Sequence, residues 1–142
     1  MPEEHVFDEL AAVANEIAEA GGRVGVGSHG QLQGLGYHWE LWAVASGGMT
    51  PLNALRAATL HGADAIGLGK DLGSVEPGKL ADLVILDRNP LDDIRNTNSV
   101  RYVMKNGRLY EGETLAEIWP RQRPGPRVEG TVERPATAAG VR

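Results

Sequence analysis

The chain has 142 residues, which suffices for one domain of ordinary size or for two small lobes with a buried core. It is too short for a complete eight-stranded α/β barrel. Its 14 basic and 19 acidic residues give a net charge of −5, and no cluster of Lys and Arg alternates with aromatic residues. We therefore expect no nucleic acid among its partners.

The absence of cysteine excludes disulfides and thiolate metal sites, so any metal would depend on His, Asp and Glu. No apolar run approaches the roughly 20 residues that span a bilayer, and the acidic start does not look like a signal peptide. These features predict a soluble, cytoplasmic protein that does not bind membranes. A chain that begins inside a helix is also compatible with a fragment of a longer protein.

Residues 3–20 predict an amphipathic helix that Gly21 and Gly22 end. The apolar face of this helix consists of Val6, Leu10, Val13 and Ile17. Residues 23–26 then predict a short apolar strand, so that the helix and the strand form one αβ unit of a parallel sheet.

The stretch of residues 25–40, which runs from the end of this strand through a polar loop, holds the densest cluster of chemically useful side chains. Its candidates for a functional site are Ser28, His29, Gln31, Gln33, Tyr37, His38 and Glu40. Loops at the carboxyl ends of parallel strands are the usual place for ligands and catalysis in α/β proteins. We therefore place the candidate site here and expect a small-molecule substrate.

Two helices are expected next. Residues 38–46 predict a short, largely buried helix that ends at Gly47. Thr50 and Pro51 then suit the N-cap and first position of a helix that runs to about Ile66. The expected buried stripe of this second helix is Leu52, Leu55, Ala58 or Thr59, Ala63 and Ile66. His61, within that helix, is interpreted as structural.

The remainder predicts a small antiparallel β lobe over residues 73–110. Residues 76–79 suit a type II turn and residues 81–87 a buried strand. Residues 100–110 predict a hairpin around Asn106–Gly107, the favoured type I′ pair, and residues 89–97 a loop with one helical turn. We expect a last short helix over residues 114–119 and a disordered or extended tail over residues 120–142.

Three segments, residues 50–59, 67–87 and 103–110, strongly resemble the carboxyl-terminal part of the amidohydrolase superfamily. The most specific string, Gly-Ser-Val-Glu-Pro-Gly-Lys-Leu-Ala-Asp-Leu-Val, covers residues 73–84. The sequence is most similar to imidazolonepropionase-like and dipeptidase-like members, over about residues 3–120. The resemblance implies a metal-dependent hydrolase built on a (β/α)₈ barrel with an added β-sandwich.

The fold expected from this resemblance is α/β, with a partial barrel end followed by a small β-sandwich lobe. Residues 1–70 would belong to the barrel and residues 71–112 to the sandwich. Residues 113–142 would form the terminal helix and tail. Because the barrel would be incomplete and its strand edges unpaired, we expect self-association into a homo-oligomer.

In the family, a divalent metal such as zinc activates a water, and a carboxylate after the eighth strand moves the proton. His29 occupies that position here, and the chain contains no His-x-His pair. By its position, His29 is a candidate catalytic residue or metal ligand. His38 could converge on the same pocket as a second metal ligand, and Gln31, Tyr37 and His38 are candidate substrate contacts. Two simpler alternatives stay open: His29 hydrogen-bonds the backbone of a glycine-rich loop, and His38 caps the following helix.

Two functions follow from these expectations. The first is an amidohydrolase-family hydrolase, or its terminal segment, that cleaves non-peptide or dipeptide-like carbon–nitrogen bonds with metal-activated water. The second is a catalytically inactive, truncated module that folds as an oligomer and binds no metal.

Overall fold

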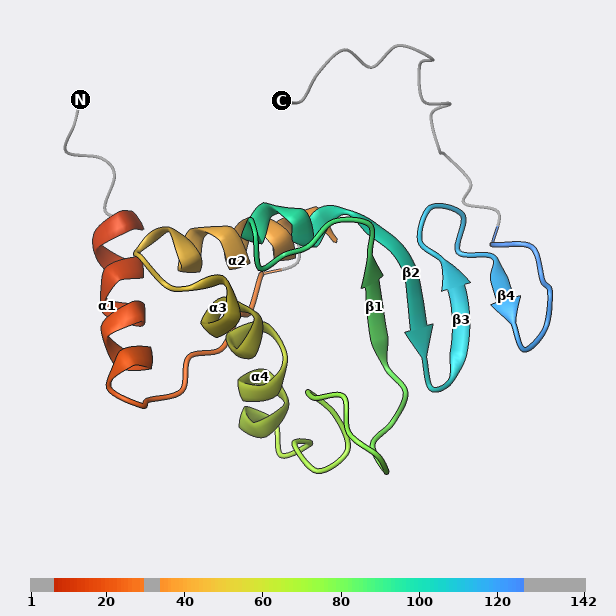
Figure 1. Ribbon diagram of the computed structural model, residues 1–142, viewed down its shortest axis with the longest axis horizontal. Helices are drawn as coiled ribbons and strands as arrows, with labels where there is room; N and C mark the ends of the chain where they lie inside the picture. Colours follow the sequence, from red (N-terminus) through yellow and green to blue (C-terminus); the bar gives the residue numbers. More distant parts are fainter. Residues whose placement is uncertain (1–6, 30–33, 127–142) are drawn as a thin grey trace, which may run out of the picture.

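The computed structural model describes residues 7–29 and 34–126. Helices occupy the first half of this part of the chain and an open antiparallel sheet the second, side by side in an elongated arrangement (Figure 1). The elements are α1 (Phe7–Glu19), α2 (Leu35–Ser46), α3 (Pro51–Ala58), α4 (Leu60–Ala65), β1 (Leu83–Leu86), the 3₁₀ helix η2 (Ile94–Asn98), β2 (Val100–Lys105), β3 (Arg108–Glu111) and β4 (Glu117–Trp119). The predicted mixture of helix and strand is confirmed.

α1 confirms the first predicted helix over its described residues, and its end lies where the two glycines predicted it. Gly21 adopts φ 82°, and the Gly22 amide donates to the carbonyl oxygen of Ile17 at 2.8 Å. The apolar face of this helix is largely exposed, with Leu10 and Val13 66% and 51% exposed. α1 packs against α2, and this contact buries Ala11 instead.

The predicted strand over residues 23–26 does not form. This segment makes no ladder with any strand in the part of the chain that the structure describes. A strand exists only through hydrogen bonds to a neighbouring strand, and the apolar pattern alone cannot supply that neighbour. Val24 and Val26 still pack on the core formed by Leu41, Met49 and Ala54.

Two local signals for α2 and α3 are confirmed. α2 ends at Gly47, and the hydroxyl of Thr50 accepts a hydrogen bond from the Asn53 amide at 3.3 Å, ahead of Pro51. α2 begins three residues earlier than predicted and is only partly buried, since Trp39 is 47% exposed.

The helix expected to run to Ile66 is instead broken at Thr59, between α3 and α4. Thr59 has φ −128° and ψ −81°, and its hydroxyl donates to the carbonyl oxygen of Leu55 at 2.7 Å, a local bond that often bends helices. The buried residues are Ala54, Ala57 and Ala63. The predicted stripe is confirmed at Ala63, where small alanines line the close contacts, and is wrong at its two ends, where Leu52 and Ile66 are 49% and 70% exposed.

The sheet has the order β1-β2-β3-β4, with every neighbouring pair antiparallel. The predicted hairpin is confirmed: Lys105 pairs with Arg108, and Asn106 and Gly107 have φ 48° and 75°. The type II turn at residues 76–79 is supported by φ 94° at Gly78 and by the hydrogen bond from the Lys79 amide to the Glu76 carbonyl.

Two expectations for the sheet are wrong. β1 is not a buried strand, because Val84 is 60% exposed. The segment predicted as a final helix contains β4, in which Glu117 pairs with Tyr110 and Trp119 with Leu109. Six residues are too few to nucleate a helix without help, whereas β3 offers unpaired backbone groups that a strand satisfies.

The sheet is a single layer among the described residues. The second half of a sandwich, the domain boundaries and self-association therefore stay predictions. Residues 127–142, the larger part of the predicted tail, lie outside the described residues. No described helix is long and apolar enough to cross a membrane.

Candidate functional site

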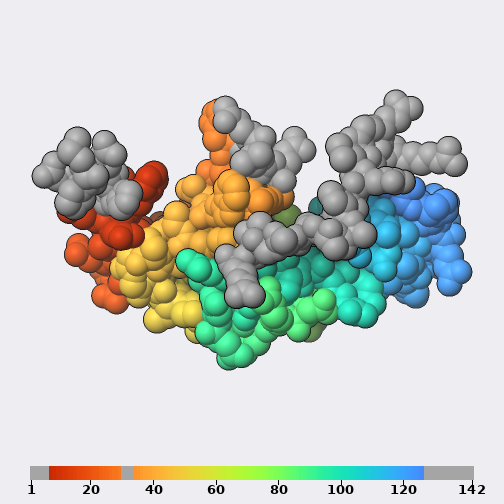
Figure 2. Space-filling model, turned by 90° about the horizontal axis from the view of Figure 1, so that it is seen from above, coloured from red at the N-terminus to blue at the C-terminus, as the bar shows by residue number. Residues whose placement is uncertain are grey.

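The loop proposed as the site connects residues 23–29, called the extended segment from here on, to α2. His29, at the end of the extended segment, is exposed. In Figure 2 the orange segment of the chain projects from the body of the molecule. Gln31 lies outside the described residues, and Gly34, with φ 79°, leads into α2. The structure thus holds His29 at the surface of the described part of the chain.

His38, in the first turns of α2, is tied to a distant part of the chain. Its Nδ1 atom lies 3.2 Å from the hydroxyl oxygen of Thr97, which belongs to η2 and is 6% exposed. The His38 ring also lies beside Trp42, with ring centroids 6.2 Å apart. Burial lowers the pKa of His38 from its usual value of 6.5, which favours the neutral imidazole.

Trp42 completes this polar cluster. Its indole N–H donates to the hydroxyl of Thr97 at 3.0 Å and to the carbonyl oxygen of Ile94 at 3.1 Å. The cluster of His38, Trp42, Thr97 and Ile94 therefore joins α2 to η2. Thr97 was not predicted from the sequence, because nothing in its neighbourhood marks it. Trp42 could have been found, since a residue four positions after His38 shares its helix face.

Tyr37 points elsewhere. Its hydroxyl donates to the carbonyl oxygen of Ala58, at the end of α3, over 2.9 Å, and burial raises the pKa of this phenol. The single phenolic proton is thus engaged in a contact that holds α2 against α3. A contact between Tyr37 and substrate stays a prediction.

The described residues do not form a metal site by themselves. Over residues 7–29 and 34–126, no three His, Asp or Glu side chains gather as a metal ion would require. A catalytic zinc usually takes three protein ligands and a water. Ligation by His29 and His38 therefore stays a prediction that needs a further ligand.

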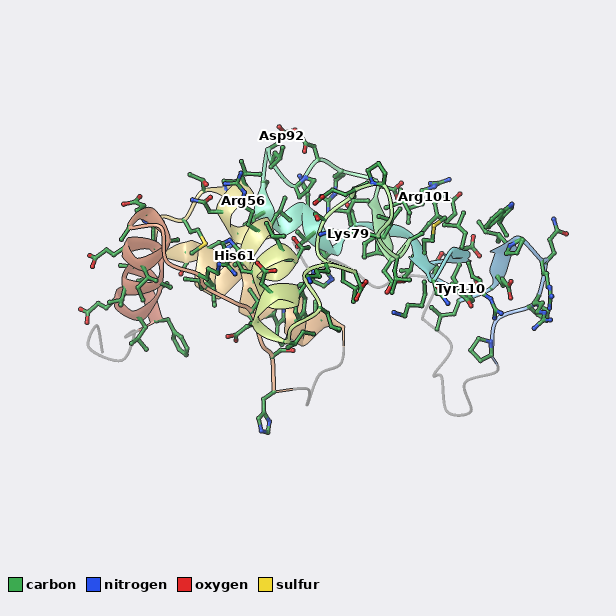
Figure 3. The ribbon with its side chains drawn as sticks, turned by 90° about the horizontal axis from the view of Figure 1, so that it is seen from below. Arg56, His61, Lys79, Asp92, Arg101 and Tyr110 are labelled. Atoms are coloured by element: carbon green, nitrogen blue, oxygen red, sulfur yellow. The ribbon has the colours of Figure 1, made fainter. Side chains whose placement is uncertain are left out.

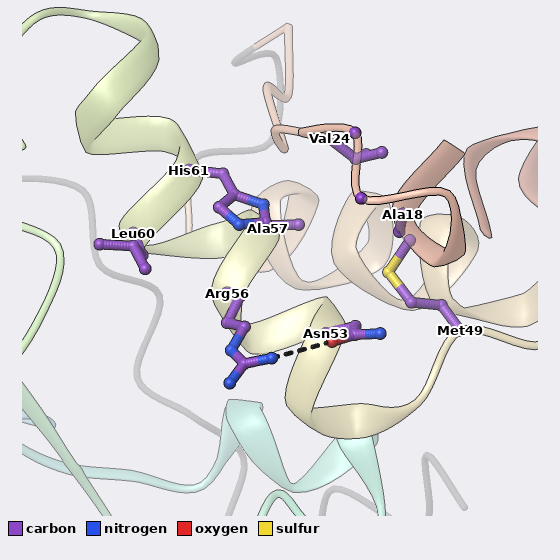
Figure 4. A pocket seen from close by; sticks show the side chains of 10 residues that line it. Ala18, Val24, Met49, Asn53, Arg56, Ala57, Leu60 and His61 are labelled. Atoms are coloured by element: carbon purple, nitrogen blue, oxygen red, sulfur yellow. Dashed lines mark hydrogen bonds between the residues drawn. The ribbon is translucent and has the colours of Figure 1, made fainter. Parts of the chain in front are cut away.

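A separate cavity of about 330 Å³ lies between α1, the extended segment and the α3–α4 pair (Figure 4). It is lined by Ala18, Gly21, Gly22, Val24, Met49, Asn53, Arg56, Ala57, Leu60 and His61. No residue predicted for the catalytic site lines it. The Nδ1 atom of His61 is buried without a hydrogen-bond partner among the described residues. Figure 3 places Arg56 and His61 in the helical half, away from Arg101 and Tyr110 on the sheet.

The sequence profile described as "Amidohydrolase family" matches residues 2–110. The chain belongs to this family, as its sequence motifs predicted. Solved structures support the assignment. A Xaa-Pro dipeptidase with bound methionine superposes with a TM-score of 0.64 at 33% identity, over 72% of this chain and 26% of that chain. Molinate hydrolase superposes with a TM-score of 0.51 at 38% identity, over 57% of this chain and 18% of that chain.

Two curated relatives match shorter stretches. Ochratoxinase from Aspergillus niger is 40% identical over 75 residues, which are 50% of this chain and 16% of that protein. Imidazolonepropionase from Shouchella clausii is 43% identical over 79 residues, which are 53% of this chain and 18% of that protein. The matched part of this chain thus spans less than a fifth of the length of either relative.

Proposed function

We propose that this chain is the carboxyl-terminal portion of an amidohydrolase-family hydrolase that cleaves carbon–nitrogen bonds of small, non-peptide or dipeptide-like amides. The observation that carries the proposal is the family match over residues 2–110, which spans both the histidine-bearing loop and the strands β1 and β2. The names of the relatives, among them imidazolonepropionase and Xaa-Pro dipeptidase, support this substrate class.

The chain would supply one edge of the active site. His29 would act as a base or metal ligand, His38 as a ligand or substrate contact, and Gln31 and Tyr37 as substrate contacts. When bound, a divalent ion such as zinc would lower the pKa of a water. Because the described residues do not complete a metal site, the further ligands would come from outside residues 7–29 and 34–126.

The proposed domain organisation follows from the family match as well. Residues 1–70 would be the terminal portion of the barrel domain, and residues 71–112 one half of a β-sandwich. Residues 113–142 would begin with β4, which completes this sheet in place of the predicted terminal helix, and would continue as a tail. The four-stranded sheet supports the sandwich part of this proposal, because a sandwich needs such a sheet as one of its layers.

Zinc binding and turnover test the catalytic proposal on the purified chain. We expect calorimetry to detect zinc binding that weakens in His29→Ala and in His38→Ala but not in His5→Ala, which removes a histidine outside the predicted site. Hydrolysis of dipeptides and N-acyl amino acids in added zinc should follow the same order. Zinc affinity and turnover that are unchanged in both site variants would remove the proposed roles.

The alternative is a catalytically inactive module that folds as a homo-oligomer. It is favoured by the exposed apolar face of α1, where Phe7, Leu10 and Ile17 are 69%, 66% and 46% exposed. Large exposed apolar patches usually mark interfaces. Self-association through this face would remove it from water.

Sedimentation distinguishes the alternative. A compact oligomer without metal or turnover, dissociated by Leu10→Glu but not by Glu9→Gln on the same helix, would support the inactive module. A well-folded monomer at micromolar concentration would contradict it.

A further inference from the structure

We propose that Thr97 and Trp42 hold His38 in one neutral tautomer, with the proton on Nδ1 and a free lone pair on Nε2. Thr97 is then a positioning residue for His38. The catalytic meaning of this inference rests on the proposed function, whereas the tautomer itself does not. It follows from counting protons and lone pairs at a single oxygen atom, the hydroxyl of Thr97.

A threonine hydroxyl has one proton to donate and two lone pairs that accept. The Thr97 oxygen lies 2.9 Å from the carbonyl oxygen of Ile94, which can only accept, so the hydroxyl proton is directed there. The indole N–H of Trp42 can only donate, and at 3.0 Å it occupies one lone pair of the hydroxyl.

One lone pair of Thr97 therefore remains, and His38 Nδ1 is the third atom within hydrogen-bond distance, at 3.2 Å. Since the hydroxyl proton is used, Nδ1 must be the donor of this bond. A neutral imidazole carries a single N–H, so its Nε2 atom is left as an acceptor.

The competing arrangement turns the hydroxyl proton toward His38 and reverses the tautomer. It is disfavoured because the Ile94 carbonyl is nearer to the hydroxyl than the imidazole is, at 2.9 Å against 3.2 Å. In that arrangement the Ile94 carbonyl would lose the Thr97 hydroxyl as a donor. Its remaining side-chain donor in this cluster would be the indole N–H of Trp42, at the longer distance of 3.1 Å.

The free nitrogen is available for chemistry. The Nε2 atom of His38 makes no hydrogen bond within the described part of the chain. It is accessible to solvent, because the one buried side-chain nitrogen without a partner among the described residues is Nδ1 of His61. A neutral imidazole nitrogen in that state binds a divalent cation or accepts a proton from a substrate. Because the hydroxyl of the buried Thr97 holds Nδ1, both the orientation of the His38 ring and its tautomer are fixed, as is usual for a ligating histidine.

Nitrogen-15 NMR of the full chain, labelled on histidine, tests this inference at pH 8. The His38 signals are assigned by their loss in His38→Ala. We expect a protonated-type shift for Nδ1 and an unprotonated-type shift for Nε2. The opposite pattern in the unmodified chain would overturn the inference, and this result requires no variant of Thr97 to fold.

Variants at Thr97 test the cause. Thr97→Val keeps the shape but removes the acceptor, so the tautomer ratio should move toward Nε2–H by roughly fivefold to tenfold, the effect of about one hydrogen bond. Thr97→Ser should restore it, because serine retains the hydroxyl. A folded Thr97→Val chain with an unchanged ratio would contradict the role of Thr97.

The same samples separate this inference from the proposed function. A His38 with the expected tautomer, in a chain whose zinc affinity and turnover ignore His38→Ala, would sustain the tautomer and reject the catalytic role. Zinc binding or turnover that depends on His38 while Nε2 carries the proton would sustain the catalytic role of His38 and reject the proposed tautomer.

Discussion

The ammonium group of Lys79 donates a hydrogen bond to the carbonyl oxygen of Gly69, over 2.7 Å. The same group lies 2.6 Å from the hydroxyl of Ser74, and the side chain is only 12% exposed. These contacts fix the turn-rich segment between α4 and β1, which has no ladder or helix to hold it. Lys79 thus joins Gly69 to Ser74 and adds side-chain hydrogen bonds to the backbone turns of this segment.

Lys79→Met should destabilise the chain by about 1–3 kcal/mol, because it leaves the carbonyl of Gly69 without this donor while preserving the apolar stem. Urea unfolding followed by circular dichroism measures the change. Lys70→Met, at an exposed position of the same segment, is the matched control and should be nearly neutral. Equal effects of the two substitutions would mean that the hydrogen bonds of Lys79 contribute nothing.

Gly47→Ala should separate α1 from α2. A Cβ atom at Gly47 would lie 2.0 Å from the carbonyl carbon of Ala11 and 2.2 Å from the amide nitrogen of Ala12, so the backbone of α1 would have to move. Such overpacking costs about 1–3 kcal/mol or more. Gly25→Ala is the control, because a Cβ there meets no atom within 4 Å. Thermal unfolding of the two variants gives the comparison, and a Gly47→Ala chain as stable as Gly25→Ala would refute the close approach.

Asp82 should contribute to stability against acid. Its carboxylate accepts hydrogen bonds from the Lys105 ammonium and from the Asn106 amide, the latter at 2.6 Å. The bond from Lys105 is the largest cause that lowers the pKa of Asp82 below its usual 3.8, followed by the bond from Asn106. The folded state thus binds this proton less readily than the unfolded state does.

The stabilisation by Asp82 is therefore present above about pH 4 and is lost as pH falls through the lower, folded-state pKa. In thermal melts between pH 7 and pH 2, Asp82→Asn should lower the melting temperature at neutral pH and reduce the loss on acidification. Asp92→Asn, on an exposed loop, serves as control. If the two variants show the same acid profile, the carboxylate of Asp82 has no special part in it.

His61→Leu should leave stability unchanged or raise it. A buried polar atom without a partner costs about 1–3 kcal/mol, and the Nδ1 atom of His61 is such an atom beside the cavity. His61→Asn retains a polar group at the site and should give no gain. A loss of stability in His61→Leu, measured by urea unfolding, would show that His61 Nδ1 has a partner, such as an ordered water in the cavity.

The local elements were readable from short sequence signals. The cap at Thr50, the turn at Asn106–Gly107 and the end of α1 at the glycine pair each depend on residues adjacent in the chain. Backbone conformation and capping are decided within a few residues, so a single sequence contains the needed information. The break at Thr59 was not predicted, because a hydrogen bond from a threonine hydroxyl to the preceding turn also occurs in many unbroken helices.

The candidate site was only partly predictable. His38 was singled out from the loop, but its partner Thr97 lies 59 positions away and has no local mark. Contact between them arises because η2 packs against α2, a relationship between elements rather than within one. The roles of His29 and Gln31 stay predictions, the first at the surface and the second outside the described residues.

The sequence by itself determined the family, most of the helices and the hairpin, since family motifs, caps and turns are encoded by neighbouring residues. The tertiary structure decided which faces are covered, whether residues 23–26 form a strand, and that residues 117–119 do. Burial and strand pairing require a partner surface, and no apolar pattern specifies whether that partner is present. For the same reason only the folded chain brings the Thr97 hydroxyl within hydrogen-bond distance of His38 Nδ1.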